Sequence, residues 1–326
     1  MSVNTERMEN ETFEDYMVRL FDAQRNRQLT CQQVADLLNV YADVKKSETT
    51  YRRYYEGFAD GRVYENRMLC GECEERILCL GDLHVPFQLP VETFRRYYGR
   101  VDTLVLPGDL MDMHSISKFQ KTYRISPVEE MILCRDYLLD LIRCVMPKKV
   151  IAMYGNHEIR FQNYLSNMLD TDIKDLLPKT PLDLILDDGF SRYDEETGTR
   201  VFYEPIRNLV DDVTVINAHN WWYQYGSTIF CHPLTFKSGM LKTAEDALLW
   251  FRNEGLAFKN LVMAHTHRIG FYVLGNSMIF ETGCCCDISK MNYIDGKLVY
   301  SQKEGFLSLL YDKNGDICSY KQEILN

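Results

Sequence analysis

The sequence predicts an α/β protein preceded by a small helical module. Two observations carry this prediction. The first 67 residues have the apolar spacing of amphipathic helices, and after Arg67 short apolar runs alternate with helical patterns. The chain has 326 residues and is 46% hydrophobic, which is enough apolar material for one large domain or two smaller ones. We therefore expect two units, residues 1–67 and residues 68–326.

The first unit is predicted to contain three short helices. Phe13 and Leu20 belong to an apolar stripe of helical spacing, and Thr30 with Gln33 has the form of a capping box before a second helix. The order of these helices resembles a helix-turn-helix module of the kind seen in phage and bacterial proteins.

The charge of this unit argues against a DNA-binding module. Residues 1–67 carry ten Lys and Arg against twelve Asp and Glu, so Arg52 and Arg53 stand almost alone as a basic pair. Docking or oligomerisation explains the module at least as well as nucleic-acid binding.

Composition also limits the functions that the whole chain can have. The formal net charge of −10 argues against broad coating of nucleic acid, because that needs many basic contacts to phosphate. No apolar run is long enough to span a membrane, and the polar start of the chain does not look like a secretory signal. We expect a cytoplasmic protein without a membrane partner, whose eleven cysteines are reduced thiols.

Three apolar runs after Arg67 are typical of buried strands. Each ends in glycine followed by Asp or Asn, in the sequences ILCLGD, VDTLVLPGD and KKVIAMYGN. Helix-like segments at residues 91–100 and 127–146 separate them, which favours a right-handed parallel βαβαβ unit. Ligands of such sheets bind beyond the carboxyl ends of the strands. The polar residues that follow the strands are therefore candidates for a binding site.

Histidine gathers at these strand ends. Asp82 and His84, spaced as Asp-x-His, project to the same side of an extended chain. A surface turn could explain this pair alone, but five of the seven histidines occupy such positions. Nitrogen and oxygen ligands without thiolate suit catalytic Mn, Fe, Co, Ni or Zn better than a structural zinc site. The full set is Asp82, His84, Asp109, Asn156, His157, His232, His265 and His267.

Five motifs in this region follow one another in a familiar order between about residues 76 and 268. They are Asp82-Leu83-His84, Gly108-Asp109-Leu110-Met111-Asp112, Gly155-Asn156-His157-Glu158, the single His232 and Ala264-His265-Thr266-His267. In these motifs the sequence resembles the calcineurin-like metallophosphoesterase superfamily. It departs from the family at Ala264, where glycine is usual, and at Glu158, where many members have aspartate. The resemblance implies a four-layer α/β/β/α sandwich with two divalent metal ions at the strand ends.

The resemblance also implies which residues hold the ions. Asp82, His84 and His267 would bind one ion, Asn156, His232 and His265 the other, and Asp109 would lie between them. Mn is the first choice of metal, with Fe, Zn, Ni or Co as alternatives. A hydroxide that bridges the two ions would attack the phosphate ester without a covalent enzyme intermediate.

Three further residues are candidate catalytic groups. His157 is not a ligand in the family's pattern and would protonate the departing oxygen. Glu158 either orients that imidazole or is simply an acid in the first turn of a helix. Arg160 completes a Gly-Asn-His-Glu-x-Arg pattern similar to the phosphoprotein phosphatase branch, in which the arginine binds phosphate. The Asp-Arg-Gly of that branch is absent, since Met113 follows Asp112.

These features predict a binuclear-metal phosphoesterase, with a phosphodiester of nucleic acid or a nucleotide as the expected substrate. A serine/threonine-type protein phosphatase is the enzymatic alternative, and a phosphate-binding scaffold is the non-enzymatic one. The acidic insertion at residues 161–215 could cap the site and select the substrate. Trp221 and Trp222 could stack on a nucleobase but fit a packed core better. The run Cys284-Cys285-Cys286 suggests no function by its spacing.

Overall fold

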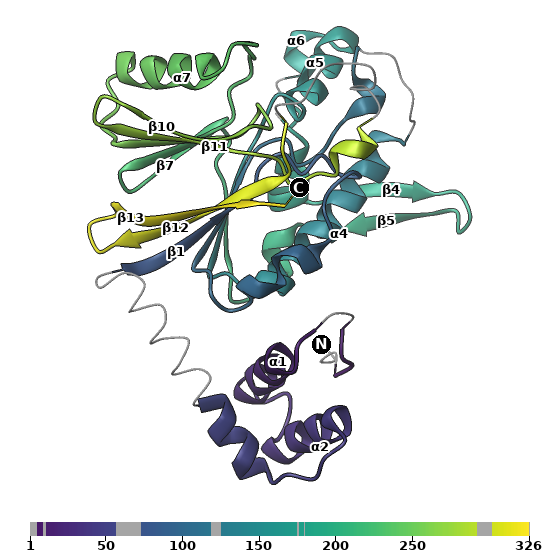
Figure 1. Ribbon diagram of the computed structural model, residues 1–326. Helices are drawn as coiled ribbons and strands as arrows, with labels where there is room; N and C mark the ends of the chain where they lie inside the picture. Colours follow the sequence, from purple (N-terminus) through teal and green to yellow (C-terminus); the bar gives the residue numbers. More distant parts are fainter. Residues whose placement is uncertain are drawn as a thin grey trace. The chain divides into compact units, whose positions relative to one another are not determined.

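The computed structural model divides into two compact units, residues 1–73 and residues 74–326 (Figure 1). The structure describes residues 5–8, 11–56, 73–118, 125–174, 176–178, 180–291 and 302–325. The boundary expected at Arg67 lies outside these residues.

The first unit contains the expected helices. Helix α1 spans Phe13–Arg25, α2 spans Cys31–Ala42, and residues 48–56 are helical as well. The capping box that begins α2 is confirmed, because Thr30 accepts a hydrogen bond from the backbone of Gln33 while the Gln33 side chain bonds back to Thr30. Aromatic rings hold the helices together, since the ring of Phe21 stacks on that of Tyr55 at 4.7 Å.

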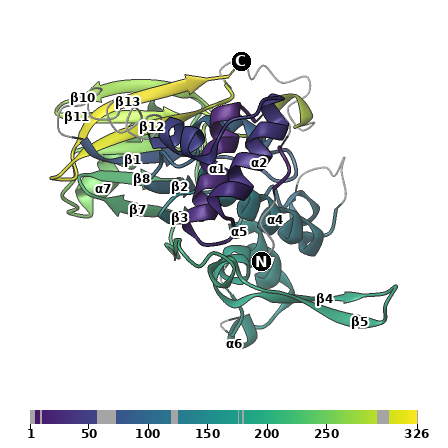
Figure 2. The ribbon, with the colours of Figure 1, turned by 90° about the horizontal axis from the view of Figure 1, so that it is seen from below.

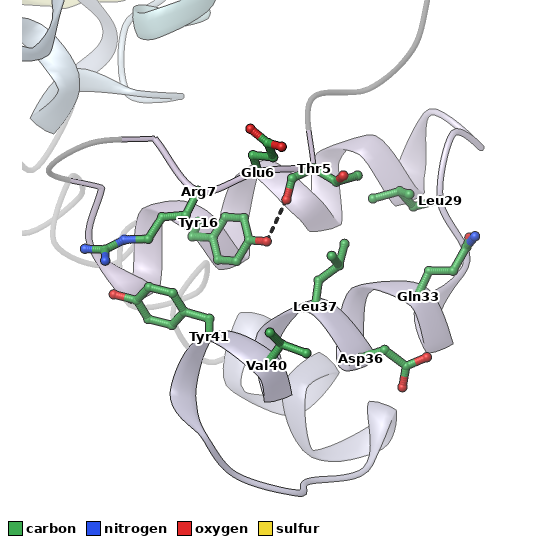
Figure 3. Close-up of a pocket in the computed structure, with 10 residues that line it drawn as sticks. All are labelled: Thr5, Glu6, Arg7, Tyr16, Leu29, Gln33, Asp36, Leu37, Val40 and Tyr41. Atoms are coloured by element: carbon green, nitrogen blue, oxygen red, sulfur yellow. Dashed lines mark hydrogen bonds between the residues drawn. The ribbon is translucent and has the colours of Figure 1, made fainter.

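An open hollow of about 640 Å³ lies beside α1 and α2 in this unit (Figure 3). Leu37, Val40 and the two tyrosines Tyr16 and Tyr41 make much of its lining apolar. The hydroxyl of Tyr16 donates to the backbone oxygen of Thr5 at one side of the hollow.

The second unit is built on two mixed sheets. The larger has the strand order β13-β12-β1-β2-β3-β6, and its neighbours β1, β2, β3 and β6 run parallel. Its strands are β1 (Cys73–Cys79), β2 (Thr103–Pro107), β3 (Lys149–Met153), β6 (Thr214–Asn217), β12 (Gly305–Asp312) and β13 (Ile317–Ile324). The last two form an antiparallel hairpin whose turn holds Asn314 and Gly315, a pair of residues that favours tight hairpin turns.

The smaller sheet has the order β10-β11-β9-β8-β7. The pairs β11–β9 and β9–β8 are parallel, and the outer pairs β10–β11 and β7–β8 are antiparallel. Its strands are β7 (Trp222–Tyr225), β8 (Thr228–Cys231), β9 (Asn260–Met263), β10 (Ile269–Leu274) and β11 (Ser277–Thr282).

Helices cover the outer face of each sheet, which gives four layers (Figure 1). Helix α4 (Pro127–Val145) and the 3₁₀ segment η1 (Val91–Tyr97) pack on the larger sheet, and α7 (Lys242–Asn253) packs on the smaller one. Side chains alternate between layers as strand geometry requires: Leu78 joins the helix-facing core, while its neighbour Ile77 joins the core between the sheets. The expected α/β/β/α sandwich is confirmed.

The insertion after the third motif forms its own small structures. It contains α5 (Ile159–Met168), α6 (Thr171–Lys174), the π-helix η3 (Asp183–Asp188), η4 (Ile206–Asn208) and the hairpin β4–β5 (Phe190–Asp194 and Thr199–Tyr203). The hairpin projects away from the sandwich in both views (Figures 1 and 2). The insertion ends in β6, so its last residues belong to the larger sheet.

The helix-like segment expected at residues 91–100 is a 3₁₀ helix over residues 91–97. The expectation of reduced thiols throughout is wrong, because Cys73 and Cys318 each take part in a disulfide bond. The scattered cysteine spacing does not reveal which thiols meet in space. Eight other described cysteines form no disulfide bond, among them Cys284, Cys285 and Cys286.

Candidate metal centre

Five strand ends meet at one edge of the sandwich. The larger sheet contributes the residues that follow β1, β2 and β3, and the smaller sheet contributes those that follow β8 and β9. The structure brings together all seven residues that the sequence suggests as ligands, namely Asp82, His84, Asp109, Asn156, His232, His265 and His267.

Asp82, His84 and His267 form one group of buried side chains. Nε2 of His267 lies 3.1 Å from Nε2 of His84 and 3.4 Å from Oδ1 of Asp82. Two ligands at about 2.1 Å from one ion are themselves about 3 Å apart, so these separations match donors that share an ion.

Asp109, Asn156, His232 and His265 form the other group. Nε2 of His232 lies 3.2 Å from Oδ2 of Asp109, 3.1 Å from Oδ1 of Asn156 and 3.1 Å from Nδ1 of His265. Oδ2 of Asp109 is also 3.7 Å from Nε2 of His84 in the first group. Asp109 therefore links the two groups.

Hydrogen bonds to the outer ring nitrogens orient two of these histidines. Nδ1 of His232 donates to the backbone oxygen of Pro107 at 2.8 Å, so the lone pair of Nε2 faces the site. Nδ1 of His84 lies 3.2 Å from Oδ1 of Asp112, which orients that ring in the same way. Such partners are typical of histidines that bind metals.

Unpaired buried atoms show that the donor set fits cations. Oδ1 of Asp82 and Nε2 of His265 are buried and have no hydrogen-bond partner within the described part of the chain. An unpaired buried polar atom is costly unless an ion or a ligand satisfies it. The carboxylates and neutral imidazoles also have the donor types that Mn²⁺, Fe²⁺ or Zn²⁺ accept.

The backbone at the site is tightly folded. Asp82, His84, Asp109, His265 and His267 all have positive φ values, of 54°, 48°, 50°, 84° and 55°. Non-glycine residues adopt this left-handed region rarely, and such residues often cluster at functional sites. A Cβ atom on Gly155 would collide with the side chain of Asp109, so glycine is needed where these loops approach.

His157 lies beside the two groups, and Asp112 and Arg160 hold its ring. Nδ1 of His157 is 2.8 Å from the backbone oxygen of Asp112 and 3.1 Å from its Oδ1. Nη2 of Arg160 donates towards Nε2 of His157 at 2.8 Å, while Nη1 donates to the backbone oxygen of Asp112 at 2.6 Å. These contacts fix the proton of the neutral ring on Nδ1.

The Glu158 carboxylate bonds to backbone groups, so the first of the two roles that the sequence left open for it, orientation of the His157 imidazole, is wrong. Both oxygens of the buried Glu158 carboxylate accept backbone N–H groups, from Asp109, Leu110, Met111 and Gly155. Burial, and after it the charge of Asp109, raises the pKa of Glu158. Glu158 begins helix α5 and ties the loop after β2 to the loop after β3. It is a structural residue of the site.

Sequence reasoning gave Asp112 no role. Burial opposes its ionisation, but hydrogen bonds with His157 and His84 keep the pKa of Asp112 well below its usual range. The carboxylate stands three residues after Asp109 within a motif already noted, so the signal was present in the sequence. Its two partners come from other loops, which the spacing alone does not reveal.

A family model decides the identity of this unit. The calcineurin-like phosphoesterase model matches residues 75–288, which include all five strand ends. The chain belongs to the calcineurin-like phosphoesterase family. It is therefore a metal-dependent phosphoric ester hydrolase, as predicted from the motifs.

Solved structures similar to this phosphoesterase include three described as phosphoesterases or as Vps29. A metallophosphoesterase from Sphaerobacter thermophilus is 15% identical, with 77% of this chain and 88% of that chain covered and a TM-score of 0.37. Wild-type Vps29 with Zn²⁺ from Entamoeba histolytica is 13% identical, with 77% and 99% covered and a TM-score of 0.36. An archaeal phosphodiesterase is 14% identical, with 77% and 99% covered and a TM-score of 0.32. No curated protein sequence matches the chain.

The helical unit of the phosphoesterase matches a second family model. Residues 1–69 match the YonJ N-terminal domain. Arg52 and Arg53 are exposed here, but the Arg52 guanidinium lies 4.0 Å from the Glu56 carboxylate, which partly offsets its charge. Among the described residues, no helix is long and apolar enough to cross a membrane.

Other candidates from the sequence are explained by packing. Trp221 stacks against Phe251 of α7 at 5.2 Å between ring centroids, and Trp222 meets the same ring edge-on at 5.5 Å. Both tryptophans therefore belong mainly to the core under α7. His219 belongs to a separate surface network, because its Nδ1 lies 3.0 Å from the carboxylate of Asp183 in the π-helix.

Proposed function

We propose that this phosphoesterase hydrolyses a phosphodiester of nucleic acid or a nucleotide with two divalent metal ions. Asp82, His84 and His267 would hold one ion, and Asn156, His232 and His265 the other. Asp109 would contact both, and its contacts with His232 and His84 at 3.2 and 3.7 Å are the observation that carries this proposal. Ions bound there would acidify water and offset the charge of the phosphate.

Arg160 supplies the contact to phosphate from the protein. Its guanidinium is half-buried and already lies between His157 and the backbone of Asp112. A planar guanidinium can donate two parallel hydrogen bonds to phosphate oxygens. An incoming phosphate would thus compete for donors that now bond to His157.

His157 supplies the proton for the departing oxygen. Its Nε2 now accepts from Arg160, so transfer requires that Arg160 move to the phosphate and leave Nε2 to carry a proton. Asp112 keeps Nδ1 in place during this exchange, since it binds that nitrogen through both its backbone oxygen and its carboxylate. Glu158 acts only by holding the two loops together.

The diester preference has two supports. Met113 follows Asp112 where the protein phosphatase branch has Arg, so one element of phosphoprotein recognition is missing. The N-terminal helices resemble a nucleic-acid-binding module in order, although their charge is balanced. Manganese is the proposed metal, because the donors are imidazole, carboxylate and amide without thiolate.

A hydrolysis screen tests the proposal. The substrates are bis-p-nitrophenyl phosphate, p-nitrophenyl phosphate, oligonucleotides, cyclic nucleotides and a phosphopeptide, each with Mn²⁺, Ni²⁺, Zn²⁺ or Mg²⁺. We expect Mn²⁺-dependent turnover of diesters at a higher kcat/KM than that of monoesters. Preference for the phosphopeptide would favour the protein phosphatase alternative and overturn the substrate class. Metal content of one ion per chain at full activity would overturn the two-ion assignment.

A further inference from the structure

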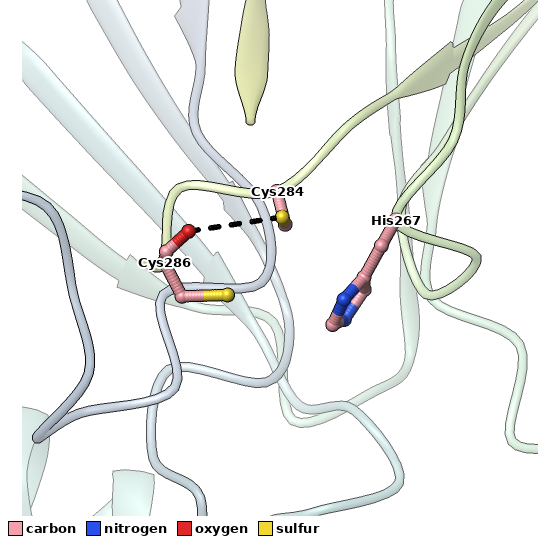
Figure 4. A group of neighbouring side chains, drawn as sticks. All are labelled: His267, Cys284 and Cys286. Carbon is pink, nitrogen blue, oxygen red and sulfur yellow. Dashed lines mark hydrogen bonds between the residues drawn. The ribbon is translucent and has the colours of Figure 1, made fainter. Parts of the chain in front are cut away.

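Two cysteines and a histidine converge beside the metal centre (Figure 4). His267, Cys284 and Cys286 each offer one donor atom, and these atoms all lie within 4.8 Å of one another. All three side chains are buried, and both cysteines are fully so. They come from different segments, because His267 follows β9 whereas the cysteines follow β11.

Cys284 and Cys286 lie on one side of the chain and Cys285 on the other. The backbone of Cys284 forms an isolated β-bridge with Glu304, and that of Cys286 forms one with Gln88, on either side of a bend at Cys285. The side chains of Cys284 and Cys286 belong to the same buried cluster. Cys285 points to the opposite side, where its Sγ lies 3.6 Å from the backbone oxygen of Gly305 and its side chain joins the helix-facing core.

A third sulfur completes the group. The short 3₁₀ helix η5 (Ile288–Lys290) turns the chain back after the cysteines. This turn places Sδ of the buried Met291 at 3.4 Å from Sγ of Cys286. Phe87 and Ile288 pack against the three sulfur-bearing residues and keep the group apolar on its outer side.

The donor types distinguish this group from the phosphoesterase centre. Nε2 of His267 faces Asp82 and His84, while its Nδ1 lies 3.4 Å from Nε2 of Gln302. Thiolate and thioether sulfur are soft ligands that select Cu⁺, and zinc sites rarely use thioether sulfur.

We propose that Cys284, Cys286 and Met291, together with His267, bind one Cu⁺ ion. Two cysteines separated by one residue provide the thiol sulfurs, and the neighbouring methionine and imidazole fill the remaining positions. Binding releases the thiol proton of each cysteine that ligates the ion and needs no change of oxidation state.

Copper binding also has a consequence for hydrolysis, which rests on the proposed function. His267 cannot keep its orientation towards Asp82 and His84 while it turns to an ion among the sulfurs. A Cu⁺ ion therefore withdraws a ligand from the catalytic set and inhibits hydrolysis.

Transfer of copper from a coloured chelate tests the site directly. The full-length protein, loaded with Mn²⁺ and kept under anaerobic reducing conditions, is titrated against the Cu⁺ complex of bicinchoninate. We expect each wild-type chain to take one more copper ion from the chelate than each Cys284→Ser chain does. Met291→Leu, which preserves apolar volume, should weaken Cu⁺ binding about tenfold or more.

Cys285→Ser is the matched control, because the side chain of Cys285 packs in the helix-facing core, away from Cys284 and Cys286. It should bind Cu⁺ as wild type does. Equal losses in Cys284→Ser and Cys285→Ser would overturn the site, as would a wild-type protein that leaves the chelate intact. Met291→Leu keeps the test decisive if Cys284→Ser fails to fold.

A second measurement separates copper binding from the proposed function. Diester hydrolysis by wild type should stop at one equivalent of Cu⁺, whereas Met291→Leu should keep its turnover at the same concentration. Stoichiometric Cu⁺ binding with unchanged wild-type turnover would overturn the link through His267. Absence of diester hydrolysis before copper is added would count against the proposed function, and the chelate titration would still judge the copper site.

Discussion

One carboxylate oxygen serves two histidines at the metal centre. Oδ1 of Asp112 lies 3.2 Å from Nδ1 of His84 and 3.1 Å from Nδ1 of His157. His84 belongs to the proposed ligand set, and His157 is the proposed proton donor. Asp112 therefore links a proposed metal ligand to the proposed proton donor, although it is not itself in the proposed ligand set.

Replacement of Asp112 by asparagine should impair both histidines. The neutral amide oxygen accepts hydrogen bonds from the two rings more weakly than the carboxylate does, so we expect metal affinity and kcat/KM to fall by about 10- to 100-fold. Metal analysis after dialysis and diester kinetics measure the two effects. Asp136→Asn, an exposed aspartate that pairs with Arg135 on α4, is the control and should change neither. Loss of activity with normal metal affinity would show that Asp112 serves only His157.

Asp109→Asn should abolish hydrolysis and weaken metal loading. Its Oδ2 is the oxygen that approaches both histidine groups, and an amide cannot bring the same negative charge between two cations. Metal content and turnover of a chromogenic diester are the measurements. A variant that retains two ions and near-normal turnover would contradict the assignment of Asp109.

His157→Ala should keep its metal ions but react about 10²- to 10⁴-fold more slowly, the usual contribution of a positioned acid. The deficit should shrink for diesters with better leaving groups, which need less protonation. His219→Ala is the matched control, because that exposed histidine bonds to Asp183 in a separate network. Loss of metal from His157→Ala would mean that His157 is a ligand.

Glu130 should make stability depend on pH. Burial raises the pKa of this carboxyl group on α4 from 4.5 to about 8, while the backbone N–H of Met113 donates to it. The folded chain thus keeps a proton that the unfolded chain releases, so the free energy of unfolding falls as pH rises from 4.5 to about 8. The slope is at most about 1.4 kcal/mol per pH unit.

Glu130→Gln should remove this part of the pH dependence. Denaturant unfolding at about pH 5 and about pH 8 measures the difference. The free energy of unfolding of Glu130→Gln, relative to that of wild type, should be higher at about pH 8 than at about pH 5. Parallel pH profiles of the two proteins would show that Glu130 is ionised in the folded chain.

Removal of residues 1–67 should leave the hydrolysis of a small diester close to the full-length rate, because every proposed ligand lies within residues 68–326. Activity on DNA or RNA should fall in the fragment if Arg52 and Arg53 guide nucleic acid, and the loss should diminish as salt is raised. Unchanged cleavage of nucleic acid would leave docking or oligomerisation as the role of the helices. An insoluble fragment would contradict the boundary at Arg67.

The three parallel strands β1, β2 and β3 and the convergence of the motifs could be predicted from the sequence. Both depend on local patterns: an apolar run predicts a buried strand, and the carboxyl ends of parallel strands lie at one edge of a sheet. Asp82 and His84 after β1 illustrate this, since a two-residue spacing was enough to place both side chains on one side.

The role of Glu158 could not be predicted in this way. Its partners are backbone N–H groups, three of them almost fifty residues away in the loop after β2, and backbone groups leave no residue-type signal. The sulfur group has the same difficulty. Met291 reaches Cys286 through the turn of η5, and His267 reaches both cysteines from another strand, so no spacing in the sequence joins the three segments.

The left-handed backbone at the strand ends limits how this centre can be redesigned. Aspartate, asparagine and histidine tolerate positive φ better than most residues with side chains, and they are also ligands. At Asp82 and Asp109, with φ of 54° and 50°, a substitute must meet both demands at once. Glutamate would preserve the carboxylate, but it disfavours this left-handed backbone conformation. Libraries that aim to change metal preference should therefore draw on asparagine and histidine at these two positions, and leave longer or β-branched residues to the segments beyond them.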